Sequence, residues 1–272
     1  MLTRTLVVIS VAACVLHPLT NSDVRISAHA PLSWEPAAPF DAMQNTDRPK
    51  RPGVKDASVK IPIERLKPDH AFEVGGNPDW IAIDDHVWVS NEPKNTVARI
   101  DPKANTVVAT IAVGKEPCSG LAAGFDSLWV PNCGDPSVSR VDLKTGAVTA
   151  TLPLTIGDSE GGLTTGAGSV WMMTDKKGTL ARIDPATNKV KAVIAAQVPG
   201  AGGEICSGGG LIWVTMNGTP VTRIDPVRNQ VVDQYGNYQK ADAIRYGFGS
   251  IWVSDHGKGD LWKIDAGKLS RR

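Results

Sequence analysis

Two carboxylate residues, Glu160 and Asp175, have the chemistry and spacing of a paired site. They lie fifteen residues apart. Facing carboxylates repel each other unless they share a proton or a cation, and an oxygen-only pair suits a hard ion such as Mg²⁺ or Ca²⁺. Solvated surface charges are the plainer interpretation, so the pair is only a candidate metal site. His256, which follows Asp255, could act as a general base, although a loop histidine is again the simpler interpretation.

Cys118 and Cys133 are separated by the same fifteen residues. Between them, Gly124-Phe-Asp-Ser127 is typical of a tight turn, and a hairpin centred there places the two cysteines directly opposite each other. Opposed residues of antiparallel strands have Cα atoms about 4.5–5.5 Å apart, which a disulfide can bridge. We therefore expect a Cys118–Cys133 disulfide, with two free thiols as the alternative. Cys206 is expected to be a buried, small apolar residue.

A repeat of about forty residues provides the strands that must position these side chains. A tryptophan recurs in the same apolar setting at Trp88, Trp129, Trp171, Trp213 and Trp252. The intervals are 41, 42, 42 and 39 residues, and a basic residue, an aliphatic residue and an aspartate follow each tryptophan. This period, with short apolar runs and Gly, Asn or Asp turns, predicts an all-β propeller of four-stranded blades. We expect the tryptophans to form its core.

The repeated aspartates are expected to form turns. Asp101-Pro-Lys-Ala-Asn105 and Asp184-Pro-Ala-Thr-Asn188 place proline second, where its fixed φ suits a type I turn, and asparagine in the left-handed position. The aspartate carboxylate would then accept backbone N–H groups two residues further on. This interpretation leaves the repeated aspartates no catalytic role.

These repeats resemble a known family. ARIDPKANTVVATIAVG (98–114) and ARIDPATNKVKAVI (181–194) resemble the YVTN repeats of YncE-like bacterial β-propellers, and they are similar to the repeats of virginiamycin B lyases. The resemblance covers roughly residues 59–266. It implies the propeller fold. It also implies, as an alternative function, the activity of a metal-dependent C–O lyase that uses a histidine as base. Such lyases carry a Glu-x-His pair, for which Asp255-His256 is the nearest counterpart in this chain.

The repeat count predicts about five blades. The fifth unit stops soon after Asp265 and lacks a fourth strand, while Ala71-Phe-Glu-Val74 matches the end of such a strand. Because a closed ring leaves no exposed edge, we expect this N-terminal strand to complete the last blade. A sixth blade assembled from residues 24–66 is the alternative.

The hairpin register gathers polar residues at one mouth of the central channel. By this register Asn77 faces Glu92, Glu160 faces Asp175, Gly202 faces Asn217, and Ala241 faces His256; Asn91, Asn132, Asp242 and Asp255 are adjacent. Loops held by a rigid scaffold commonly carry function. The candidate ligand-binding residues are therefore Asn77, Glu92, Glu160, Asp175, Asn217, Asp242, Asp255 and His256. Within the inner strands, Asp79, Glu204 and Arg245 could form a polar cluster, for which a structural ion pair is the default.

The N-terminal residues are typical of an export signal. A charged start is followed by an apolar run from Leu6 to Leu16, which is too short to span a bilayer. Val11-Ala-Ala-Cys14 resembles a lipobox and makes Cys14 a candidate lipidation site, with ordinary cleavage as the alternative. The predicted organisation is a leader (1–30), a proline-rich linker (31–57) and a propeller (58–268). Export would place the domain in the periplasm or outside the cell, either free or lipid-anchored.

Composition narrows the function classes. The formal net charge of +1 offers no basic footprint for nucleic acid or an anionic membrane, and Walker and Rossmann motifs are absent from the sequence. We expect an exported, monomeric, non-catalytic propeller that binds a small molecule or protein at its acidic mouth. The alternative is the lyase activity implied by the resemblance. Any membrane contact would run through the N-terminal lipid.

Overall fold

The computed structural model describes residues 58, 65–157, 161–196, 203–216, 219–236, 241–255 and 259–270. The chain divides into two units, and every described strand belongs to the one that contains Phe72–Arg272. The predicted leader (1–30) and the predicted linker (31–57) both lie outside the described residues. Within the described part, no helix is long and apolar enough to cross a membrane.

Nineteen strands form five antiparallel sheets among the described residues. The sheets follow the chain in order: β1 (Pro78–Ile83), β2 (Val87–Asn91), β3 (Thr96–Asp101) and β4 (Thr106–Ala112); β5 (Ala122–Gly124), β6 (Ser127–Asn132), β7 (Ser137–Asp142) and β8 (Val148–Pro153); β9 (Leu163–Gly166), β10 (Ser169–Met173), β11 (Thr179–Asp184) and β12 (Lys189–Ala195); β13 (Gly203–Gly208), β14 (Leu211–Met216), β15 (Thr219–Asp225) and β16 (Gln230–Tyr235); β17 (Ala241–Gly247), β18 (Ser250–Asp255) and β19 (Asp260–Asp265). Short 3₁₀ helices, η3 (Glu92–Lys94) and η4 (Lys268–Ser270), follow β2 and β19.

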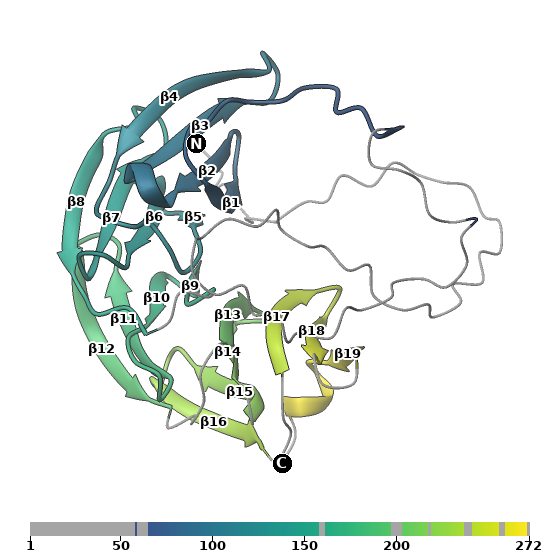
Figure 1. The fold of residues 1–272 in the computed structure, drawn as a ribbon. Coiled ribbons are helices and arrows are strands. Elements are labelled where there is room, and N and C mark those ends of the chain that lie inside the picture. The colour runs from purple at the N-terminus through teal and green to yellow at the C-terminus, as the bar shows by residue number, and fades with distance from the viewer. Residues whose placement is uncertain are drawn as a thin grey trace, which may run out of the picture. The chain divides into compact units, whose positions relative to one another are not determined.

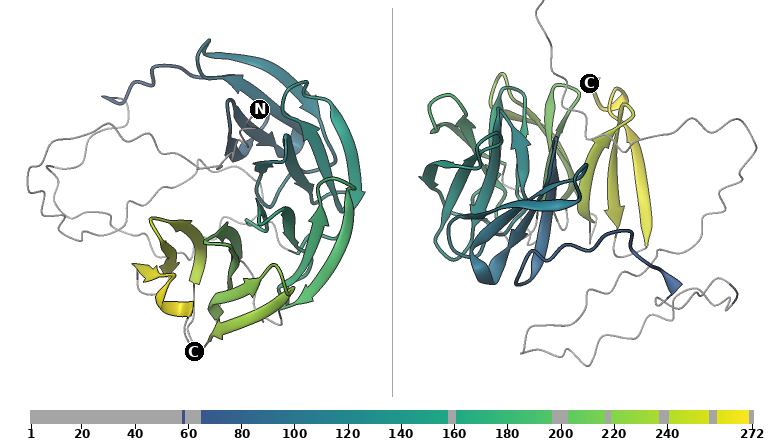
Figure 2. Two further views of the ribbon diagram at one scale, coloured as in Figure 1. Left: turned by 180° about the vertical axis from the view of Figure 1, so that it is seen from behind. Right: turned by 90° about the horizontal axis from the view of Figure 1, so that it is seen from above.

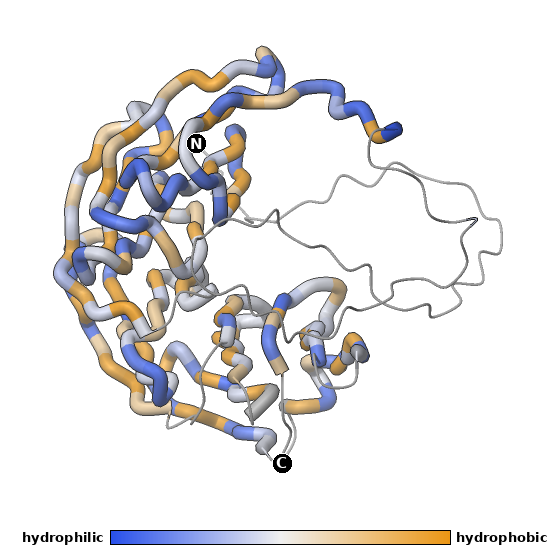
Figure 3. The backbone as a smooth tube through the Cα atoms, viewed as in Figure 1, coloured by the Kyte–Doolittle hydropathy of each residue, from blue (hydrophilic) through white to orange (hydrophobic). Residues whose placement is uncertain are grey.

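The five sheets stand side by side along an arc, with β1, β5, β9, β13 and β17 on its inner side and β4, β8, β12 and β16 on its outer side (Figure 1). Consecutive inner strands contact one another. Hydrophobic residues are interspersed along the strands of all five sheets (Figure 3). The predicted all-β architecture of about five propeller blades is therefore confirmed. We number these blades as the first to the fifth sheet.

The repeated tryptophan lies on the second strand of every sheet, and in the first four sheets it packs against the next sheet. Trp88, Trp129, Trp171 and Trp213 are completely buried. The indole of Trp129 donates to the carbonyl of Gly124 at 3.2 Å, and that of Trp171 donates to Gly166 at 3.0 Å. Because a strand with sheets on both sides is covered on both faces, the apolar residues that flank Trp129, Trp171 and Trp213 are buried as well.

The turns between the third and fourth strands have the chemistry that the sequence predicts. One carboxylate oxygen of Asp101 accepts the backbone N–H groups of Lys103 and Ala104, at 2.8 and 3.0 Å. Asn105, Asn188 and Asn229 have φ values of 52°, 57° and 55°, in the left-handed region. Hydrogen bonds from Ala104 and Lys103 hold the pKa of Asp101 below its ordinary value. The repeated aspartates are thus turn-forming residues.

The predicted closing strand is not present as a strand. Residues 70–77 contain no β-structure, and the fifth sheet has the three strands β17, β18 and β19 among the described residues. The Asn91 side chain donates to the carbonyl of Val74 at 2.5 Å, and Gly75 and Gly76 then turn the chain, with φ values of 75° and 60°. Residues 72–77 therefore lead directly into β1 of the first sheet. Apart from Ser58, Arg65 and Leu66, the alternative sixth blade lies outside the described residues.

Candidate functional site

The candidate site is the edge of the arc at which the first strand of each sheet begins and the second strand ends. The predicted register holds there in the first sheet. Pro78 pairs with Asn91, which sets Asn77 opposite Glu92. Cys118 and Cys133 form a disulfide whose Cα atoms are 5.9 Å apart. The predicted disulfide is therefore confirmed, although Pro117 pairs with Asn132, which places Cys118 opposite Pro131 and not directly opposite Cys133.

The register is wrong in the fifth sheet. Ala241 pairs with Asp255, whereas the sequence predicts His256 as its partner. A bulge between Ala241 and Ile244 shifts the pairing by one residue, and the Ser254 hydroxyl accepts the N–H of Ala243 at 3.0 Å within it. Asp255, predicted to lie on the rim, is buried. A bulge inserts one unpaired residue, and here it moves the partner of Ala241 from His256 to Asp255.

Several predicted residues cannot be placed. Glu160, Asn217 and His256 lie outside the described part of the chain, and so does Gly202. The pairing of Glu160 with Asp175 and any catalytic role for His256 therefore remain predictions. Within the described residues, no three His, Cys, Asp or Glu side chains are grouped as a metal site would require.

Asp175 is engaged in its own turn. One carboxylate oxygen accepts the backbone N–H groups of Lys177 and Thr179, at 2.8 and 3.0 Å, and the other accepts the Thr179 hydroxyl at 2.6 Å. Partial burial tends to raise the pKa of Asp175, but the hydrogen bonds from Thr179 and Lys177 outweigh it, and the pKa lies below its ordinary value. Asp175 is thus an ionised turn residue, and a cation would have to use its remaining lone pairs.

The strongest electrostatic feature of this edge is a group of three carboxylates from the first two sheets. Asp79 lies on β1, Glu92 begins η3, and Glu116 belongs to the connection between β4 and β5. Burial raises the pKa of Glu92, and the charges of Asp79 and Glu116 raise it further. Burial also raises the pKa of Asp79. We call Asp79, Glu92 and Glu116 the acidic cluster.

The connection that carries Glu116 is held on several sides. The backbone N–H of Glu116 donates to the Asn95 side-chain oxygen at 2.9 Å, and its carbonyl accepts the N–H of Cys133 at 2.8 Å. The disulfide follows two residues later at Cys118. The sequence analysis did not select Glu116 as a candidate site residue. Its position two residues before Cys118 could have indicated that its loop is held in place by the disulfide.

Two asparagines that were expected near the rim are buried instead. Asn91 holds the carbonyl of Val74, and the Asn132 amide donates to the hydroxyl groups of Ser137 and Ser139, each at 3.0 Å. In both asparagines the side-chain oxygen is buried and accepts no hydrogen bond from the described residues.

The inner strands β13 and β17 are joined by an ion pair. Glu204 accepts hydrogen bonds from the Arg245 guanidinium and, at 3.0 Å, from the backbone N–H of Ile244. This agrees with the structural ion pair taken as the default. Cys206, on the same strand as Glu204, is buried, and burial raises the pKa of its thiol to about 12. Cys206 is therefore a core residue with little thiolate character.

Neither a protein-family model nor a curated protein matches this chain. Among solved structures, it is similar to Kuenenia stuttgartiensis hydrazine synthase, with 18% identity over 70% of this chain and 58% of the other, and a TM-score of 0.56. It is also similar to virginiamycin B lyase from Staphylococcus aureus, with 17% identity over 69% and 66% and a TM-score of 0.54.

A third similar structure is the β-propeller domain of Myceliophteria thermophila Cps50 (Swd1), with 11% identity over 66% of this chain and 62% of the other, and a TM-score of 0.54. This chain spans about three fifths to two thirds of these three proteins. At such low identity the similarity concerns the fold. The chain is therefore a β-propeller-type protein that matches part of larger relatives.

Proposed function

We propose that this chain is an exported, non-catalytic propeller of the YncE-like type, and that the acidic edge of its blades binds a cationic group on a small ligand or protein partner. The observation that carries this proposal is the electrostatic state of the acidic cluster. Burial raises the pKa of Glu92, and the charges of Asp79 and Glu116 raise it further. A cation bound among these carboxylates would relieve their mutual repulsion.

The cluster has no internal counter-charge in the described structure. Lys94 and Lys115 belong to the same loops, yet none of the three carboxylates forms an ion pair with a described residue. By contrast, Glu204 is neutralised by Arg245 further along the arc. Charge on the acidic cluster therefore remains available to a ligand, whereas the charge on Glu204 is used within the fold.

The support around Glu116 favours binding through a preformed site. The connection to β5 is fixed by Asn95, by backbone hydrogen bonds to Cys133 and Gly134, and by the Cys118–Cys133 disulfide. A rigid loop loses little conformational entropy when a ligand binds. The disulfide also supports export, since disulfides persist in oxidising compartments.

A tetralysine peptide is a direct probe of the proposed site. Isothermal titration calorimetry at pH 7.5 and low salt should detect binding, which weakens as salt screens the charges. Glu92→Gln and Glu116→Gln should each weaken the peptide at least fivefold. Asp126→Asn removes one charge from the turn between β5 and β6, at the opposite edge of the second sheet, and should leave binding unchanged. Equal affinity in all four proteins would contradict the proposal.

A further inference from the structure

Four junctions join the five sheets, and in each the face that carries the repeated tryptophan, the tryptophan face, packs on the following sheet. The fifth sheet, drawn in yellow-green to yellow, ends the arc (Figure 2). No described sheet covers its tryptophan face, on which Trp252 is only partly buried and Leu261 is 65% exposed. The fifth sheet therefore shows how exposed a side chain is when no junction lies beside it.

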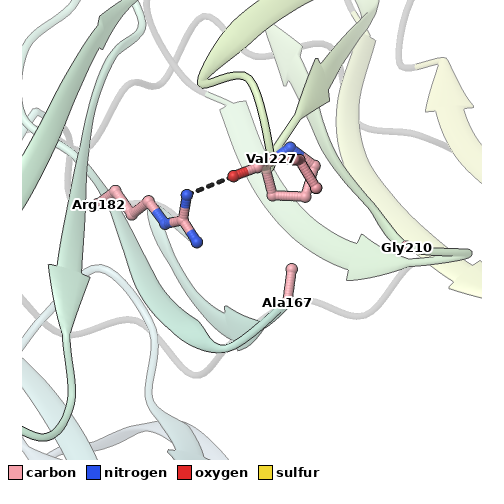
Figure 4. A pocket seen from close by; sticks show the side chains of 5 residues that line it. Ala167, Arg182, Gly210 and Val227 are labelled. Carbon is pink, nitrogen blue, oxygen red and sulfur yellow. Dashed lines mark hydrogen bonds between the residues drawn. The ribbon is translucent and has the colours of Figure 1, made fainter.

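An arginine crosses the junction between the third and fourth sheets. The guanidinium carbon of Arg182 lies 5.0 Å from the centre of the Trp171 ring. Its Nη1 donates to the carbonyl of Pro226 and, at 2.8 Å, to the side-chain oxygen of Asn229, both in the turn after β15 (Figure 4). Arg140 makes the equivalent contacts between the second and third sheets. The two arginines thus hold neighbouring sheets together in the same way.

The two arginines differ at their other terminal nitrogen. Nη2 of Arg140 donates to the carbonyl of Phe125 at 3.4 Å. Nη2 of Arg182 has no hydrogen-bond partner within the described residues, and no described carboxylate forms an ion pair with Arg182. A guanidinium N–H group without a protein acceptor can donate to an anionic group, and such charge-assisted hydrogen bonds are strong.

A pocket of about 510 Å³ opens beside the Arg182 guanidinium, and its lining residues are Ala167, Arg182, Gly210, Pro226 and Val227. They belong to β11 and to the β9–β10, β13–β14 and β15–β16 turns, so the pocket lies at the edge opposite the acidic cluster. Figure 4 shows the guanidinium pointing into the pocket. The volume is within the range of about 300–1,000 Å³ found for small-molecule sites. Apart from Arg182, the lining residues have no polar side chain.

The turn residue at position 167 explains why this junction is open. Ala167, Phe125 and Phe248 each lie four residues before the repeated tryptophan, with φ values of 48°, 56° and 54°. Phe125 is 37% exposed, whereas Phe248 is 86% exposed. Only Phe125 has a following sheet beside it, and the Thr165 hydroxyl of that sheet donates to the Ala123 carbonyl next to the turn at 2.8 Å. A junction therefore accommodates a phenyl ring, and Ala167 leaves the corresponding space empty.

We infer that this pocket binds a small aromatic carboxylic acid. The aromatic ring would occupy the space that the Phe125 ring fills one sheet earlier, against Pro226 and Val227. The carboxylate would accept a hydrogen bond from Nη2 of Arg182 and supply the counter-charge that this guanidinium lacks in the described structure. The site is separate from the acidic cluster and takes a group of the opposite charge, so neither proposal depends on the other.

A nuclear magnetic resonance titration of the full chain with 3-phenylpropionate tests this inference. The acid should bind with a dissociation constant on the order of 1 mM, as a small ligand in an open pocket does. The neutral analogue 3-phenylpropionamide should bind about tenfold more weakly, because it lacks the charge-assisted hydrogen bond. Added salt should weaken the acid but not the amide.

Three variants locate the bound ring. Ala167→Phe gives the third sheet the turn residue of the second, at a φ value that Phe125 already adopts, and should abolish binding by filling the pocket. Val227→Glu changes a residue that is 87% exposed, so it should fold normally, and its carboxylate should compete with the ligand for Arg182. Phe248→Ala is the matched control, since it changes the same turn position where no junction follows, and it should bind like the wild type.

Melting curves establish that each variant is folded. Equal affinity of the wild type and Ala167→Phe would overturn the inference, and so would equal affinity for the acid and the amide. If Ala167→Phe does not fold, Val227→Glu decides the matter, and unchanged affinity in that variant overturns the inference. A wild type that does not bind the acid at millimolar concentration would overturn it, as would loss of binding in Phe248→Ala.

Discussion

The third and fifth sheets carry nearly the same sequence around their tryptophans, but they bury them to different extents. Trp171 in SVWM is completely buried, while Trp252 in SIWV is only partly buried. Both indoles donate to a glycine carbonyl five residues earlier, at 3.0 and 3.2 Å. The local conformation is therefore the same, and the difference comes from the neighbouring sheet. The repeat determines each blade, whereas its stabilisation depends on what packs against the blade.

The largest expected effect separates these two tryptophans. Trp171→Ala would open a cavity between the third and fourth sheets and should cost about 3–5 kcal/mol of unfolding free energy. Trp252→Ala removes a side chain that is already partly in water and should cost about 2 kcal/mol. Urea denaturation followed by circular dichroism measures both values. Equal losses would show that the fifth sheet is covered as completely as the third.

The hairpins of the second and fifth sheets differ in a second respect. The β5–β6 hairpin is extended by a disulfide that closes a fifteen-residue separation, while the β17–β18 hairpin ends in a bulge. Replacing Cys118 and Cys133 by serine should cost about 3 kcal/mol through the entropy of the unfolded chain. Cys206→Ala is the control, since that thiol is unpaired and buried and alanine adds no polar group to the core. A dithiothreitol-insensitive melting temperature in the wild type would contradict this prediction.

The guanidinium contacts provide a smaller test of the same contrast. Arg182→Met removes hydrogen bonds to Pro226 and Asn229 and should cost about 1.5–3 kcal/mol. Lys263→Met removes a cation that lies over Trp252 but has no partner turn within the described chain, and it should cost about 0.5–1 kcal/mol. Denaturation midpoints of the two variants give the comparison. A larger loss for Lys263→Met would mean that the fifth sheet is held by contacts that its uncovered face does not show.

The same contrast explains which features could be predicted from sequence. Turn chemistry is local, so the roles of Asp101 and Asn105 follow from five residues, and the disulfide follows from one hairpin. The partner of Ala241 cannot be predicted from the hairpin sequence, because the bulge between Ala241 and Ile244 depends on how the neighbouring strands pair. Glu116 was missed because it is near Glu92 only in the folded chain, where the connection to the second sheet passes the end of the first. The closing strand was wrong because Val74 is bound by Asn91 at the first sheet, a contact that no spacing reveals.

The smallest expected effect is a difference in pH dependence between a turn carboxylate, Asp142, and a carboxylate of the acidic cluster, Glu92. Hydrogen bonds from Thr145 and Lys144 lower the pKa of Asp142. Its contribution to stability is therefore present above the ordinary carboxylate pKa and is lost as the pH falls through the folded-state value. The pKa of Glu92 is raised by burial and by the charges of Asp79 and Glu116, so its ionisation above that pKa opposes folding.

Neutral variants should accordingly shift the melting temperature in opposite directions at pH 7. Asp142→Asn should lower it by a few degrees, and the loss should shrink as the pH falls toward 3, where the wild-type carboxylate is also becoming protonated. Glu92→Gln should raise it by a degree or two at pH 7 and have no stabilising effect at acidic pH, where Glu92 is already neutral. Scanning calorimetry at both pH values gives the signs. If Glu92→Gln destabilised the protein at pH 7, the Glu92 charge would already be compensated within the fold. The acidic cluster would then have no uncompensated repulsion that a bound cation could relieve.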